Sequence, residues 1–136
     1  MKTRRSLIPR YLPAIATVLA VACGVQGCMT AQTYEGERRA RDEVARINGD
    51  LRVTAGAPIS VILRRVDEQV LTVSQNSVDV LPGKHTLLVD CRVQETGSVT
   101  RYSLEQDFFA GRTYRLVAET GPGLRECTAV RIEASD

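Results

Sequence analysis

The sequence is poor in the side chains on which nucleic-acid and enzyme sites are commonly built. Its 136 residues include no Trp, two Phe, four Tyr and a single His. Aromatic rings on which bases or sugars could stack are therefore scarce. With a single histidine, the chain has only one candidate of this type for a general base that activates a nucleophile. These shortages weigh against nucleic-acid binding and against catalysis.

The chain also lacks a surplus of either charge. Lys and Arg number 18 and Asp and Glu 16, a formal net charge of +2. Four of the basic residues and none of the acids lie in residues 1–27, so the remainder has 14 basic and 16 acidic residues, a net charge of about −2. Binding to phosphate backbones needs a basic surface. We therefore expect no nucleic-acid partner.

Catalytic, cofactor and metal motifs are absent from the sequence. It contains no Gly-x-Ser-x-Gly, no Gly-x-Gly-x-x-Gly, no phosphate-binding loop, no Cys-x-x-Cys and no His pair at ligand spacing. We expect a protein that is not an enzyme and holds no cofactor or metal. A structural role is favoured for His85, although Ser60, Ser77 and Asp79 are conceivable partners for a catalytic one.

The first 25 residues have the layout of an export signal. Residues 1–10, MKTRRSLIPR, are basic, and residues 11–25, YLPAIATVLAVACGV, are apolar. A membrane span needs about 20 apolar residues, so an uncleaved anchor helix is the less favoured alternative. Residues 3–8 are similar to a twin-arginine export signal. Both the twin-arginine route and general secretion stay open.

The end of this segment, Val25-Gln26-Gly27-Cys28, resembles the lipobox of bacterial lipoproteins. The lipobox has an aliphatic residue at −3, a small one at −1 and a cysteine at +1. The resemblance implies that residues 1–27 are a signal peptide and that Cys28 becomes a lipidated N-terminus. Cys23 is a second candidate that fits less well, because Ala20 occupies its −3 position.

The same resemblance implies a location. Two or three acyl chains on one cysteine hold a small domain on a membrane almost permanently. Met29, rather than Asp, follows Cys28, and in enterobacteria-like sorting this implies transfer to the outer membrane. We therefore expect a lipid-anchored protein on the outer membrane that faces the periplasm.

Further segments are similar to small uncharacterised proteobacterial lipoproteins. Those proteins show Tyr-x-Gly, basic residues and Glu-Val-Ala near the mature N-terminus, and a later Leu-Pro-Gly-x-His. The matching residues here are Tyr34, Gly36, Arg41, Glu43-Val44-Ala45 and Leu81-Pro82-Gly83-Lys84-His85, with a further match over Ala110-Gly111-Arg112-Thr113-Tyr114. The resemblance implies a location and a β-domain but no activity.

The remainder predicts short strands separated by turns. Residues 29–40 are polar, so residues 28–40 are interpreted as the lipidated cysteine and a tether, and residues 41–136 as one domain. Asn48-Gly49 predicts a hairpin turn, and Leu81-Pro82-Gly83-Lys84 a second turn. Strands at intervals of roughly 8–12 residues predict an all-β fold. We expect a small antiparallel β-sandwich, Ig-like or prealbumin-like.

The strand over residues 85–93 has the clearest pattern. One face carries His85, Leu87, Val89, Cys91 and Val93, and the other carries Thr86, Asp90 and Arg92, with Leu88 as the exception. Cys91 thus faces the predicted core. Cys127 lies opposite Val130 and Ile132 by alternation and needs a bulge near Thr128 to face inward.

An even number of cysteines remains after Cys28 and favours a disulfide between Cys91 and Cys127. Two buried free thiols are the alternative.

The sequence thus predicts a membrane-anchored lipoprotein whose β-domain binds or assembles with another envelope protein through its sheet edges or loops. The alternative is an envelope module that binds a small molecule, a peptide or a glycan in a concave apolar pocket.

Overall fold

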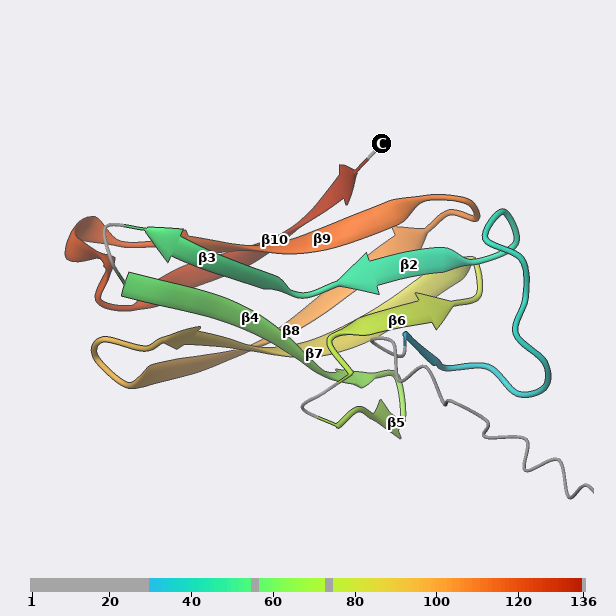
Figure 1. The fold of residues 1–136 in the computed structure, drawn as a ribbon, viewed down its shortest axis with the longest axis horizontal. Helices are drawn as coiled ribbons and strands as arrows, with labels where there is room; N and C mark the ends of the chain where they lie inside the picture. Colours follow the sequence, from blue (N-terminus) through green and yellow to red (C-terminus); the bar gives the residue numbers. More distant parts are fainter. Residues whose placement is uncertain (1–29, 55–56, 73–74, 136) are drawn as a thin grey trace, which may run out of the picture.

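The computed structural model describes residues 30–54, 57–72 and 75–135, which form two β-sheets packed face to face (Figure 1). The strands are β1 (Ala31–Gln32), β2 (Ala45–Asn48), β3 (Asp50–Thr54), β4 (Ala57–Val66), β5 (Gln69–Val70), β6 (Ser77–Val80), β7 (Gly83–Val93), β8 (Ser98–Phe108), β9 (Thr113–Thr120) and β10 (Cys127–Ser135). A short 3-10 helix covers Pro122–Leu124. The predicted all-β sandwich is confirmed.

The strands divide between two sheets of different connectivity. Sheet A has the order β1-β6-β2-β9-β10, and sheet B has the order β3-β4-β7-β8, with β5 paired to β4. Most neighbours are antiparallel, while β1 pairs with β6 and β2 pairs with β9 in parallel. The two longest strands, β7 and β8, pair along their full length in sheet B. They give sheet B a long, regular outer face.

The core fills the space between the sheets with aliphatic side chains. Leu87, Val89, Cys91 and Val93 of β7 are fully buried, as their alternation predicts. They pack against residues of sheet A such as Ile47. The inner faces are therefore occupied by packed side chains, and the residues left to solvent are those on the outer faces and in the turns.

The connection at Gly49 differs from the predicted hairpin. Strands β2 and β3 do not pair with each other, because the chain crosses there from sheet A to sheet B (Figure 1). Gly49 donates its N–H to the carbonyl of Asn76 over 2.9 Å. A Cβ on Gly49 would lie 2.1 Å from the Asn76 side chain. Glycine is needed here for this close approach rather than for a tight turn.

A disulfide joins the two sheets on the side where β8 and β10 are the edge strands. Cys91 of β7 and Cys127 of β10 form a disulfide, with 6.2 Å between their Cα atoms. The pairing of β10 with β9 shifts between Cys127 and Ala129, and this irregularity lets Cys127 and Val130 both be buried. Nearby, the hydroxyl of Tyr102 on β8 donates to the carbonyl of Cys127 over 2.8 Å. The edge strands of the two sheets are thereby tied together.

The segment assigned to the tether is partly included in the fold. Ala31–Gln32 form β1 at the edge of sheet A, and the Thr33 N–H donates to the carbonyl of Asp79. Arg41 also reaches Asp79, with 3.9 Å between the charged atoms. The packed part of the chain therefore begins before the predicted boundary at residue 41, because β1 pairs with β6 in sheet A.

Removal of the disulfide is expected to lower the free energy of unfolding. The double variant Cys91→Ala/Cys127→Ala should lose about 3–4 kcal/mol, because the cross-link between residues 36 positions apart no longer restricts the unfolded chain. Urea unfolding of the full chain in detergent micelles, followed by circular dichroism, measures the change. Reduced wild type serves as the control. Equal midpoints for the oxidised wild type and the double variant would contradict the expectation.

Candidate functional site

The sequence-predicted site residues have different outcomes. The lipobox and Cys28 lie outside the described residues, so the lipidation site remains a prediction. Cys91 and Cys127 form the disulfide described above and serve the fold. In the described part of the chain, no three His, Cys, Asp or Glu side chains gather as a metal site would need. The same residues contain no helix of the length and hydropathy that a membrane crossing requires.

His85 lies where β7 begins and bridges two turns. Its Nδ1 is 2.6 Å from Oδ2 of Asp67, and its Nε2 is 2.7 Å from the carbonyl oxygen of Leu81. Both neighbours are acceptors, so both ring nitrogens are used in holding the two turns together. Ser60, Ser77 and Asp79 do not take part in these contacts. The side-chain partner of His85, Asp67, lies 18 residues away in the sequence, so local pattern does not bring the two together.

Asp67 itself is fixed by its neighbours. Its Oδ1 accepts the Thr86 N–H over 2.9 Å, and its backbone N–H donates to the Thr86 carbonyl. Partial burial of the carboxyl disfavours ionisation, but the hydrogen bonds from His85 and Thr86 outweigh it and hold the pKa of Asp67 below its ordinary value. This arrangement stabilises the turn between β4 and β5.

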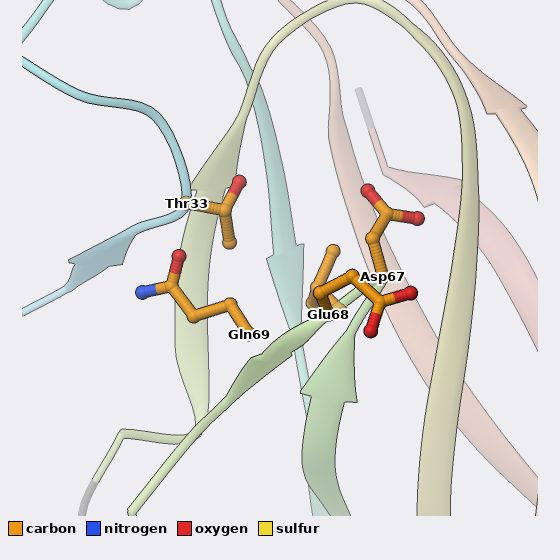
Figure 2. Close-up of a pocket in the computed structure, with 5 residues that line it drawn as sticks. Thr33, Asp67, Glu68 and Gln69 are labelled. Carbon is orange, nitrogen blue, oxygen red and sulfur yellow. The ribbon is translucent and has the colours of Figure 1, made fainter.

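Beside this turn the surface is hollowed. Figure 2 shows Thr33, Asp67, Glu68 and Gln69 around the hollow, which Val66 also lines and whose volume is about 350 Å³. A second hollow of about 550 Å³ lies where the β7–β8 turn contacts the β9–β10 connection through the Thr96 hydroxyl and the Arg125 carbonyl. Its lining is Glu95, Thr96, Gly123 and Arg125. Of the described residues, Val66 is the one aliphatic residue that lines the first hollow, and none lines the second, whereas the ligand-binding alternative predicts walls built mainly from apolar residues.

The outer face of sheet B carries a more distinctive arrangement. Strand pairing aligns side chains across the sheet in two adjacent rows. One row is Leu51, Ser60, Arg92 and Val99, and the next is Ile62, Asp90 and Arg101. Arg64 of β4 reaches into the second row. We call these eight residues the sheet B patch.

Asp90 lies at the centre of the sheet B patch and is only 7% exposed, although it points away from the core. Its two carboxylate oxygens accept hydrogen bonds from Nε and Nη2 of Arg101 over 2.7 and 3.0 Å. Nε of Arg64 is 3.4 Å from the second oxygen. The hydrogen bonds from Arg101 outweigh burial and hold the pKa of Asp90 below its ordinary value.

The arginines of the patch remain open to solvent. The side chain of Arg101 is 57% exposed and that of Arg64 is 36% exposed. Arg92 is exposed as well and adds to the positive field around Asp90. One carboxylate therefore stands among three guanidinium groups. The patch has a formal charge of +2, opposite in sign to the chain after residue 27 as a whole.

Aliphatic side chains flank these charges. Leu51 is 70% exposed and Val99 is 51% exposed, and they lie at the two ends of the Arg92 row. Single exposed aliphatic residues are common on protein surfaces. Two of them in one row with arginine on a sheet face form a mixed surface of the kind enriched in protein interfaces.

Sheet A carries a related ion pair that is covered. Asp79 is 2% exposed and accepts hydrogen bonds from Nε and Nη2 of Arg46 over 2.8 and 2.9 Å. These hydrogen bonds raise the pKa of Arg46. Arg41 and β1 pack over this pair, so it stabilises the fold. In the Asp90 cluster, formed by Asp90, Arg64 and Arg101, the arginine side chains are instead partly exposed to solvent.

Comparison with known proteins gives no assignment. No family model, no curated protein and no solved structure matches the chain.

The charge on Asp90 should make stability depend on pH. A carboxyl whose pKa is lowered by folding stabilises the protein above the pKa of the unfolded chain, about 4, and this contribution is lost as the pH falls through the folded-state pKa. Asp90→Asn is expected to cost about 1–3 kcal/mol at neutral pH and progressively less below about pH 4. Urea unfolding across this pH range measures the difference.

Glu95→Gln is the matched control, because Glu95 is exposed in the β7–β8 turn. A difference between wild type and Asp90→Asn that stays constant at acid pH would show that the charge of Asp90 is not the cause.

Proposed function

We propose that this chain is a membrane-anchored periplasmic lipoprotein whose β-sandwich is a non-catalytic domain that binds another protein of the cell envelope. The observation that carries the binding part is the sheet B patch, where exposed aliphatic residues and arginines share a regular sheet face. The anchoring part is based on the lipobox-like sequence that ends at Cys28.

Two features support the location. A disulfide is typical of proteins outside the reducing cytoplasm, and Cys91 and Cys127 form one. Strand β1 begins at Ala31, three residues after Cys28, and three residues reach at most about 11 Å. Lipidation of Cys28 would therefore hold the β1 side of the sandwich close to the membrane surface.

Two features support binding rather than catalysis. Both ring nitrogens of His85 are occupied by Asp67 and Leu81, so the best candidate for a general base serves the fold. Exposed arginine and aliphatic side chains lie together on the outer face of sheet B. A partner is therefore expected on this face rather than as an added edge strand.

The anchor is tested by metabolic labelling with radioactive palmitate. We expect wild type to incorporate label and to fractionate with outer membranes, and Cys28→Ser to do neither, because the thioether needs the Cys28 thiol. Cys23→Ser is the control and should label as wild type does. A Cys28→Ser protein that still labels and still fractionates with membranes would contradict the lipid anchor.

The binding face is tested by photocrosslinking in intact cells. A photoreactive phenylalanine analogue in place of Leu51 should give a discrete covalent adduct, because Leu51 lies on the open sheet B patch. The same analogue in place of Arg115, which is exposed on β9 of sheet A, should give none. Equal adducts from both positions, or none from either, would contradict binding at sheet B.

A further inference from the structure

The sheet B patch has the features of a preorganised receptor for anions. A guanidinium offers five N–H donors in a planar fork. Arg101 uses its Nε and Nη2 on Asp90, and this bidentate contact fixes the plane of the group. Nη1 is not used in this contact with Asp90, and the side chain that carries it is more than half exposed. Donors held in one orientation lose less entropy when they bind an acceptor.

Asp90 is too deeply placed to neutralise the whole patch. It balances one of the three arginines, and its own oxygens are covered by Arg101 and Arg64. Arg92 follows Asp90 by two residues on the same face of β7, so their Cα atoms are about 7 Å apart. The remaining charge of +2 is therefore spread over adjacent exposed guanidinium groups, a spacing that suits two carboxylates on one extended segment.

The exposed aliphatic side chains beside the arginines favour a polypeptide over a phosphate or a lipid headgroup as the source of the anion. Leu51 and Val99 bracket Arg92 across the sheet. A free phosphate or a lipid headgroup would leave these side chains in water, whereas a polypeptide can cover them with apolar side chains placed between its acids.

We propose that the sheet B patch binds an extended acidic segment of a partner protein, with its carboxylates on Arg92 and Arg101 and its aliphatic side chains on Leu51 and Val99. This inference depends on the proposed binding function and specifies the chemistry of the partner. The two row ends are about 14 Å apart across four strands, so a short segment of a few residues covers the patch.

A binding assay with a defined peptide tests the inference. The probe is a fluorescein-labelled peptide with the repeat Glu-Ser-Leu-Ser, which places Glu and Leu on the same face of an extended chain. It is added to the purified full chain in detergent micelles and followed by fluorescence anisotropy. We expect saturable binding that weakens as salt is added. Arg92→Gln should weaken it about tenfold through loss of one charged contact. The control Arg115→Gln, on the opposite sheet, should bind as wild type does. Circular dichroism and an intact disulfide confirm that both variants fold.

Three outcomes would overturn the inference: equal binding of a peptide with Lys in place of Glu, equal weakening by Arg92→Gln and Arg115→Gln, or displacement of the peptide by millimolar glycerol phosphate, which would indicate a lipid headgroup site. The assay uses purified protein, so its result is independent of the labelling and crosslinking experiments. If the peptide does not bind but the analogue at position 51 gives a discrete adduct, the proposal of an acidic partner is wrong and the proposed binding function still stands.

Discussion

The buried carboxylate of Asp90 is the constraint on which the outer face of sheet B depends. The period of two in β7 places Asp90 on the solvent side, while the neighbouring strands cover it almost completely. A carboxylate that has lost its water needs other donors, and Arg101 and Arg64 supply them from β8 and β4. The cluster therefore links three strands of the sheet and leaves its arginines pointing outward.

Strand β7 connects this cluster to the rest of the molecule. The residue after Asp90 is Cys91, which faces inward and is bonded to Cys127 of sheet A. One side of β7 thus holds the two sheets together, while the other side organises the charged surface. These contacts from both sides of β7 are what would keep the proposed binding face in one geometry before a partner binds.

Local pattern predicts the strands well and their partners poorly. Alternation over residues 85–93 identifies the core face of β7, and alternation over residues 127–132 identifies the need for a bulge near Thr128. The hairpin expected at Gly49 was wrong because the decisive contact, Asn76, is far away in the sequence. The Asp90 cluster was missed for the same reason: alternation tells which way Asp90 points, but only the register brings Arg101 opposite to it. An acid inside an apolar strand was the available signal.

The claim that Asp90 preorders the arginines is tested most directly by nitrogen NMR of the arginine side chains in the free protein. We predict slow exchange of the Nε proton with water for Arg101, which donates it to Asp90, and fast exchange for Arg92, which is exposed. Asp90→Asn should make the Arg101 proton exchange faster. Equally fast exchange for both arginines in wild type would contradict the account, because the guanidinium of Arg101 would then be free to rotate.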